Sequence, residues 1–291
     1  MTQSATMTEL QRRVKRKRML GAIVQYTLAI SVTIIALFPL YWMFISSFKS
    51  TEEMLLAVPT FWPREWHFEN YTNVMQKAPF GRYFFNTIVV TLSTMLLQTI
   101  VGIFAAYGFA KGDFWGKDLL FVLVLGALMI PIQVTFIPIY TMVSKLGWIN
   151  TFAGLIVPDA VSAYFIFMLR QNFMSVDNSY LEAARVDGMG RIGTIFRILV
   201  PMCKPAIVTV LVITFINGWN SYFWPKMVTT KPLRRTIALG VAELRKAYAG
   251  TEIMNFNEIM AGSLMSIVPV IILFLLCQKY ILTGFSKNAM K

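Results

Sequence analysis

Long hydrophobic runs without any charged residue, separated by short polar segments, dominate the chain. Such runs cover residues 19–48, 83–110 and 119–144. A helix that crosses a bilayer needs about 20 apolar residues. Six segments meet this length, and the pattern predicts a membrane-spanning helix in each: about 21–45, 84–110, 119–143, 151–171, 205–225 and 259–280. The fourth is the weakest, because Pro158 and Asp159 interrupt it. We therefore expect an all-α, polytopic membrane protein.

Composition supports lipid as the solvent. The chain is 56% hydrophobic and 14% charged, whereas a soluble domain carries about 25% charged residues. The net charge of +13 is also typical of nucleic-acid binding, but the basic residues lie at the ends of the apolar runs and not in one stripe. The charge therefore indicates membrane topology and not a nucleic-acid partner.

The basic residues predict which side each loop occupies. RRVKRKR (Arg12–Arg18) precedes the first run, which is longer than the roughly 7–15 residues of a signal-peptide core. We expect a basic cytoplasmic tail at 1–18, a single permease-type membrane domain at 19–281 and a cytoplasmic tail at 282–291. This topology places 16 Lys and Arg inside and 11 outside, in the direction of the positive-inside rule. The basic segment 226–258 leaves open one missed or extra span.

The two long loops expected outside differ in character. Residues 46–82 contain several aromatics and the lone His67, which has no metal-ligating neighbour at suitable spacing and is interpreted as a surface histidine. In residues 226–258, Ile237, Val241, Leu244 and Tyr248 share one helical face. This face fits either an interfacial amphipathic helix or a contact with a partner or substrate. The two cysteines, Cys203 and Cys277, are expected to be free thiols.

The most informative polar segment is the loop at 172–204, between the fourth and fifth spans. Ser179 and Glu182 have capping-box spacing, with Ser179 as the helix cap. Gly188 and Gly190 are expected to end this helix and permit a tight turn. A second helical stretch at about 191–199 presents Ile192, Ile195, Phe196 and Leu199 at helical spacing, and Pro201 and Pro205 are expected to end it. Two short helices along the inner membrane face fit either a simple linker or a docking site.

The same loop carries a family resemblance. Glu182-Ala183-Ala184, Gly188, Ile198 and Pro201 stand at the spacing of the signature (EAA) loop of permease subunits of ATP-binding-cassette importers, with Val200 where leucine is usual. Segments 167–188, 218–225 and 259–270 and the C-terminal tail resemble the MalG-like carbohydrate group. The resemblance implies a MetI-like type I permease fold in the bacterial inner membrane. It also implies that Glu182, Ala183, Ala184, Gly188, Ile198 and Pro201 couple the chain to an ATPase.

The resemblance also implies the partners. These are a second homologous permease, two ATP-binding-cassette ATPase subunits and an external solute-binding protein. The chain has no GxxxxGK[ST] phosphate-binding loop, which an ATPase of this class needs. No nucleophile–base pair is visible either. We therefore expect a non-enzymatic subunit that binds no cofactor itself, while a partner uses ATP and Mg²⁺.

Polar residues inside the spans are candidates for the substrate pathway, because they are costly in lipid and often face a cavity. Asn217, Trp219, Asn220 and Tyr222 cluster in the fifth span, and Gln133 lies between Pro131 and Pro138 in the third. Amide and hydroxyl groups beside aromatic rings suit a sugar, although hydrogen bonding between helices explains them equally.

Asp159 is the only acid within a predicted span. It fits a helix cap, a water-exposed position, a substrate contact or an ion site. The leading interpretation is an importer of sugars or oligosaccharides. The alternatives are the same machinery importing glycerol 3-phosphate, an ion-coupled secondary transporter that uses Asp159, and a membrane scaffold without cargo. Neutral sugars are favoured over a phosphate ester, because no basic residue lies well inside a span.

Overall fold

Helices form the whole of the described structure. This computed structural model describes residues 2–247 and 255–289, and no strand occurs among them. The chain divides into two compact units, unit 1 (Met1–Thr72 and Glu252–Leu264) and unit 2 (Asn73–Thr251 and Met265–Lys291). Because each unit has its own packing, each is described by itself below.

Three single helices are long and apolar enough to cross a membrane. They are the apolar parts Arg18–Ser46 of α1 (Thr2–Ser46), Phe80–Lys111, which is the whole of α4, and Phe256–Lys279 of α15 (Phe256–Ala289). Three bent helix pairs pass the same test of length and composition, so the described residues provide up to six spans. The all-α polytopic fold expected from the sequence is confirmed.

The segment expected to form the third span is not one straight helix. It consists of α5 (Lys117–Met129) and α6 (Ile132–Lys145), which meet at 100°. Pro131 separates them, and the residue before it, Ile130, is extended with ψ 116°. A residue that precedes proline is disfavoured in the α region, so the helix ends there. The prediction of an unbroken span over 119–143 was therefore wrong.

The fourth and fifth segments are also interrupted. Residues 151–171 comprise α7 (Phe152–Ile156), the short 3₁₀ helix η1 (Val157–Asp159) and the start of α8 (Ala163–Met174), with a bend of 41°. The expected interruption at Pro158 and Asp159 is confirmed. The fifth helix, α12 (Lys204–Trp219), ends before residue 225, and the separate helix α13 (Phe223–Val228) follows it.

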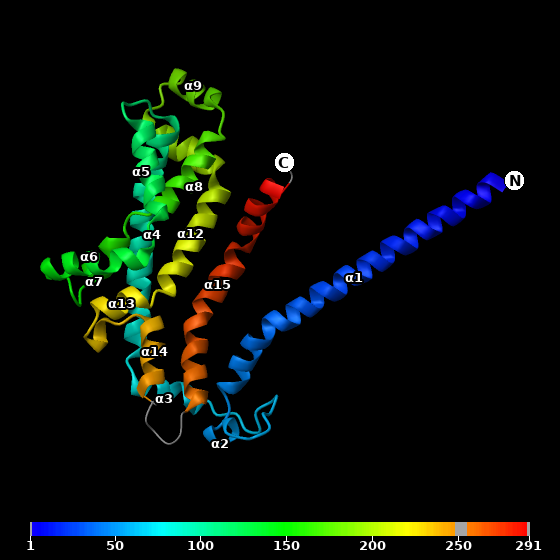
Figure 1. Cartoon of the computed structure of the whole chain (residues 1–291), viewed down its shortest axis with the longest axis vertical. Coiled ribbons are helices and arrows are strands. Elements are labelled where there is room, and N and C mark those ends of the chain that lie inside the picture. Colours follow the sequence, from blue (N-terminus) through cyan, green and yellow to red (C-terminus); the bar gives the residue numbers. More distant parts are fainter. Residues whose placement is uncertain (1, 248–254, 290–291) are drawn as a thin grey trace. The chain divides into compact units, whose positions relative to one another are not determined.

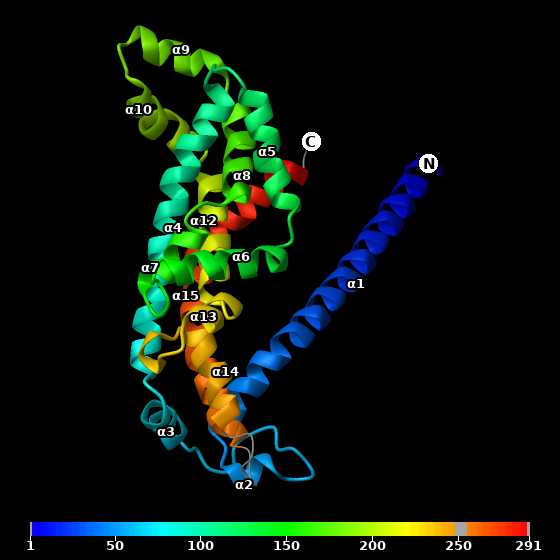
Figure 2. The same cartoon turned by 60° about the vertical axis from the view of Figure 1, so that its left-hand side comes forward.

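The core of unit 2 lies between α4, α8 and α12, which run side by side in both Figure 1 and Figure 2. Phe165, Leu169 and Phe173 of α8 are fully buried there. Gly102 of α4 faces Phe165, and a Cβ at Gly102 would lie 2.4 Å from the Phe165 ring. The missing side chain therefore allows the backbone of α4 to approach α8 closely.

The basic segment after α13 also packs on α4. It contains η3 (Pro232–Arg234) and α14 (Ile237–Ala247). Ile237 and Leu244 are buried, and α14 contacts α4 with Gly240 against the ring of Tyr83. The apolar face of α14 is therefore covered by the chain itself, which corrects the interpretation as an interfacial helix. Tyr248 lies outside the described residues.

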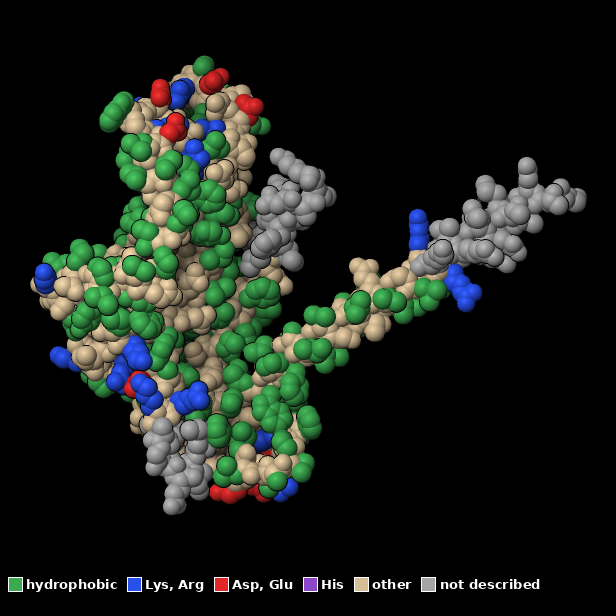
Figure 3. All heavy atoms as spheres, viewed as in Figure 1, with side chains coloured by type: hydrophobic (Ala, Val, Ile, Leu, Met, Phe, Trp, Pro, Cys, Tyr) green, Lys and Arg blue, Asp and Glu red, His purple; other side chains and the backbone are tan. Residues whose placement is uncertain are grey.

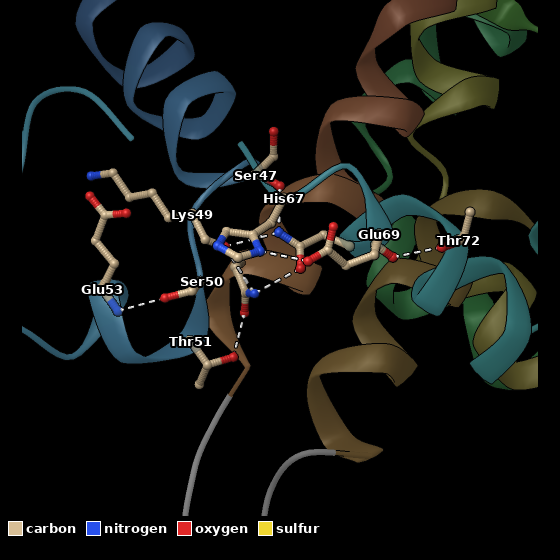
Figure 4. Close-up of polar contacts among 10 residues, drawn as sticks. Ser47, Lys49, Ser50, Thr51, Glu53, His67, Glu69 and Thr72 are labelled. Atoms are coloured by element: carbon tan, nitrogen blue, oxygen red, sulfur yellow. Dashed lines mark hydrogen bonds and ion pairs between the residues drawn. The ribbon is translucent and has the colours of Figure 1, made fainter. Parts of the chain in front are cut away.

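Unit 1 is organised around the turn after α1, which Figure 4 shows in detail. The side-chain amide of Asn70 donates to the backbone carbonyls of Ser47 and Lys49, both at 2.9 Å, and Asn257 donates to the Lys49 carbonyl at 3.1 Å. Around this knot lie α2 (Thr51–Met54) and the start of α3 (Glu69–Lys77). His67 pairs with Glu69, with Nδ1 to Oε1 at 2.5 Å. It is a half-buried structural residue and not a plain surface one.

The outer flank of unit 2 is apolar, as expected for contact with lipid. Figure 3 shows hydrophobic side chains over the bundle and a concentration of acidic and basic groups at the end that carries α9 (Asn178–Val186). Leu119, Val122 and Leu123 of α5 are each more than half exposed. A soluble monomer rarely exposes so large an apolar area, so lipid or a partner protein covers this flank.

The contact between Gly102 and Phe165 predicts that Gly102→Ala destabilises the protein by about 1–3 kcal/mol, the usual cost of overpacking. Gly108→Ala is the matched control, because Gly108 lies in the same helix with open space around its Cβ position and alanine favours helix. Thermal unfolding of both variants in detergent checks the prediction. Equal melting temperatures would contradict it.

Candidate functional site

The polar segment between α8 and α12 forms the charged end of unit 2. Its first helix, α9, begins at Asn178 and is capped by Asp177, whose carboxylate accepts a hydrogen bond from the backbone N–H of Ser179 at 2.8 Å. This bond holds the pKa of Asp177 below its usual value. The predicted cap at Ser179 was therefore wrong. Asp caps helices as well as Ser does, and here the helix starts earlier than the capping-box spacing indicated.

The two faces of α9 are distinct. Leu181 and Ala184 are buried, and Leu181 joins the core beside Phe173 and Ile195. Glu182 and Ala183 are exposed on the opposite face. Of the three consecutive motif residues, two are thus available to a partner, while the small side chain of Ala184 lets the helix lie close to the bundle.

Gly188 ends α9 in a left-handed conformation, with φ 75°. The Met189 N–H donates to the Ala184 carbonyl at 2.8 Å, and the Gly188 N–H donates to the Arg185 carbonyl at 3.0 Å. These two bonds form a Schellman motif, which glycine favours at this position. The tight turn predicted at Gly188 is confirmed. Gly190 has φ −68° and precedes α10 (Arg191–Thr194) without needing this freedom.

A π-helical turn lies in the second half of the segment. It is η2 (Ile195–Leu199), in which the N–H of Val200 donates to the Ile195 carbonyl five residues earlier. Helix α11 (Val200–Met202) continues through Pro201, so the expectation that Pro201 ends the stretch was wrong. Proline lacks an N–H and crowds the carbonyl four residues before it, and a wider turn relieves both problems. Ile198 is half-buried and Pro201 is exposed.

Lys111, at the end of α4, fastens the start of α9. Its Nζ donates to the Val176 carbonyl and to Oδ1 of Asn178, both at 2.7 Å. A cavity of about 220 Å³ lies beside this contact, with Lys117, Glu182 and Arg185 among its lining residues. Both ends of α9 are therefore held, the first by Lys111 and the second by the glycine turn.

A second cavity, of about 230 Å³, lies where the interrupted helices meet. Its lining combines apolar, aromatic and polar side chains, namely Ile132, Phe136, Ile139, Pro158, Asp159, Ser221, Tyr222, Phe223 and Trp224. Asp159 is exposed and is the last residue of η1, whereas the helix cap of α8 is Ser162. The interpretation of Asp159 as a cap was wrong, and its water-exposed alternative fits.

The structure separates the residues proposed for the substrate pathway. Tyr222 lines the second cavity. Trp219 is buried and its Nε1 donates to the Ser266 carbonyl at 2.9 Å, which ties α12 to α15 within unit 2. Asn217, Asn220 and Gln133 are exposed and do not line this cavity. Their role in a pathway stays a prediction.

Two polar residues with structural roles near the cavity were missed from the sequence. Gln98, in the middle of α4, donates from Nε2 to the Asp159 carbonyl at 2.6 Å and accepts from Thr214 at 3.3 Å. Asn150, with φ 61°, accepts from the backbone N–H groups of Thr230 and Lys231. A lone glutamine inside a span was the available signal for Gln98, because such groups need a partner in lipid.

Metal chemistry has no visible site in the described part of the chain, where no group of three or more His, Cys, Asp and Glu side chains could hold an ion.

Comparison with known proteins gives consistent matches. The family model described as "Binding-protein-dependent transport system inner membrane component" matches residues 98–284. The arabinooligosaccharides transport system permease protein AraQ of Bacillus subtilis (strain 168) is 31% identical over 89% of this chain and 92% of its own length. The sn-glycerol-3-phosphate transport system permease protein UgpE of Yersinia enterocolitica is 28% identical over 93% of this chain and 98% of its own.

A solved structure shares the fold. A chain in the crystal structure of a bacterial ABC transporter involved in the import of the acidic polysaccharide alginate superposes with a TM-score of 0.80 and 24% sequence identity. The match covers 90% of this chain and 96% of that one.

The Schellman turn predicts that Gly188→Ala weakens the end of α9 by about 1 kcal/mol, the cost of a left-handed L-residue. The Met189 amide should then exchange its hydrogen about fivefold faster. Hydrogen exchange with mass spectrometry measures this. Gly190→Ala is the control, because Gly190 has negative φ and open space at its Cβ position. Equal exchange in both variants would refute the prediction.

The Lys111 contact predicts that Lys111→Met frees the first turn of α9 while keeping the length of the side chain. Loss of two hydrogen bonds from a charged donor should accelerate amide exchange over residues 178–181 by about tenfold or more. Lys117→Met is the control, because Lys117 Nζ contacts the Gly112 carbonyl and not α9. The same measurement decides between a fastened and an independent α9. An unchanged exchange rate would mean that Lys111 does not hold α9.

Proposed function

The chain belongs to the family of inner membrane components of binding-protein-dependent transport systems, and on this premise we propose that it is the translocation subunit of an ATP-driven importer of sugars or oligosaccharides. A transporter of this kind needs a place where work done by an ATPase enters the membrane domain. The single observation that carries the proposal is the mounting of α9, which presents Glu182 and Ala183 outward while Leu181 and Ala184 are anchored in the core.

The mounting fits α9 as a coupling element. A partner that displaces the exposed face of α9 also displaces α4, through Lys111, and α8, through the buried Leu181. Coupling between distant sites requires such an element with two arrangements that both sites bias. In this proposal Glu182 meets the ATPase surface, Gly188 shapes the turn, and Ile198 and Pro201 form the return towards α12.

The other parts of the machine belong to partners. A second homologous permease completes the translocation unit, two ATPase subunits bind and hydrolyse ATP with Mg²⁺, and an external solute-binding protein delivers the cargo. This chain itself carries out no hydrolysis and binds no cofactor. The multi-pass chain lies in the inner membrane of a bacterium, with both termini in the cytoplasm and the loops 46–82 and 226–258 outside.

The class of cargo is supported by relatives and by charge. The relative AraQ is named for arabinooligosaccharides and UgpE for sn-glycerol 3-phosphate, so the phosphate ester is the second candidate. The cavity at the helix interruptions is lined by Asp159 and by no Lys or Arg among the described residues. A phosphate dianion is disfavoured beside a carboxylate, so we favour neutral sugars. The family membership argues against an ion-coupled transporter built on Asp159.

The proposal predicts that Glu182→Lys lowers ATP-dependent uptake by about tenfold or more, the expected loss when one charged contact becomes repulsive. Transport is measured in proteoliposomes that contain the second permease and the ATPase. Glu65→Lys is the control, because Glu65 is exposed and the change in charge is the same. Uptake that is independent of ATP, or unaffected by Glu182→Lys, would contradict the proposal.

A further inference from the structure

Three interrupted helices of unit 2 converge on the cavity of about 230 Å³. The chain leaves helical geometry at Pro131, after Asp159 and again after Trp219. Residues next to each of these breaks line the cavity. Non-helical backbone at membrane depth is tolerated only where it is buried in protein or faces a water-filled space. Convergence of three breaks on one space therefore indicates a polar chamber and not a packing defect.

The breaks are built into the fold. The Asp159 carbonyl, which loses its helical partner at the break, receives the side-chain amide of Gln98 at 2.6 Å. Trp224 on the opposite wall donates from Nε1 to the Gly154 carbonyl at 3.0 Å. These bonds hold the η1 wall and the α13 wall in fixed positions, which a binding site requires.

Aromatic rings line one side of the cavity in a layered arrangement. The ring centroids of Phe136 and Phe223 lie 4.5 Å apart with an interplanar angle of 22°, and those of Phe136 and Trp224 lie 6.5 Å apart at 13°. Nearly parallel rings offer flat apolar faces. The C–H groups on one side of a sugar ring pack well against such faces, while its hydroxyl groups point sideways to polar partners.

Polar partners are present at the edge of the same cavity. Asp159 is the only charged lining residue in the described structure, and the hydroxyls of Ser221 and Tyr222 lie with it. Lys226 lies near, with Nζ 5.4 Å from the centroid of the Tyr222 ring, but its charge is opposed by Glu243. A carboxylate only accepts hydrogen bonds, so it suits hydroxyl or ammonium donors and repels acidic groups.

We propose that this cavity is a subsite for one neutral or amino-substituted sugar ring of the cargo. Phe136, Phe223 and Trp224 form the apolar wall, and Asp159 is the residue that determines specificity against anionic sugars. A cavity of about 150 Å³ accommodates benzene, so the larger space here fits a single substituted ring and not an oligosaccharide. The inference rests on the proposed function for its cargo, but its test does not depend on ATP-driven transport.

The test places a cysteine at Ser221 and probes it with two small thiol reagents of opposite charge. Ser221→Cys is made in a chain with Cys277→Ser, because Cys203 is buried. The assembled complex is treated with aminoethyl and sulfonatoethyl methanethiosulfonate. The negative field of Asp159 should make the cationic reagent react faster by about tenfold relative to a free thiol. Asp159→Asn should abolish that preference, and Asp113→Asn, an exposed acid outside the cavity, should preserve it.

Sugar binding is tested by protection of the same introduced thiol. Arabinotriose, diacetylchitobiose and maltotriose are the neutral probes, and glucuronate and glycerol 3-phosphate are the anionic ones. At ten times its Kd a bound sugar slows labelling by about tenfold. Protection by at least one neutral probe, reduced by Tyr222→Phe and by Asp159→Asn, supports the subsite.

Three results would overturn the subsite. They are a Ser221→Cys variant that reacts with neither reagent in any nucleotide state, a charge preference unaffected by Asp159→Asn, and protection by the anionic probes alone or by none. Absent ATP-driven uptake in the unmodified complex would instead overturn the proposed function. The two failures are therefore distinguishable.

Discussion

The need to satisfy every backbone polar group in lipid is the constraint on which this fold depends. Continuous helices satisfy it automatically, as α4 does over Phe80–Lys111. Each interruption elsewhere needs a substitute partner. Gln98 serves the carbonyl of Asp159, and the Schellman bonds serve the end of α9. The positions of these substitutes decide where the bundle can open a polar space and where it can present a helix to a partner.

The two functional regions follow from this constraint in different ways. At the charged end, α9 lies outside the apolar bundle and needs fastening, which Lys111 and Leu181 supply. At the cavity, the breaks near Pro131 and Asp159 lie within apolar segments, so their exposed backbone must meet water or protein. Close packing of α4 on α8 at Gly102 connects the two regions through one rigid helix pair.

Much of the fold was readable from the sequence, because uncharged runs and prolines are strong local signals. The six apolar segments, the interruption at Pro158 and the turn at Gly188 follow from composition and backbone chemistry alone. The direction of the chain after a break does not, because it depends on tertiary contacts. The 100° bend at Pro131, the burial of the α14 face and the role of Trp219 as a packing residue needed the structure.

The candidate sites divide in the same manner. The spacing from Glu182 to Pro201 identified the coupling segment, but only the structure shows which motif residues face outward. Of the five residues proposed for the pathway, only Tyr222 lines the cavity. Its partners Asp159, Phe136 and Trp224 come from three separate segments, and no spacing rule within one segment could have brought them together.

The π-helical turn at Ile195–Leu199 has an evolutionary consequence. Such a turn is the geometry left when one extra residue is accommodated inside an α-helix. Removing a single residue from this stretch would restore an ordinary helix and rotate everything after it by about 100°, the angle of one helical residue. The lineage of this chain is thus expected to tolerate substitutions here far better than changes in length, since the register of α12 is counted from this turn.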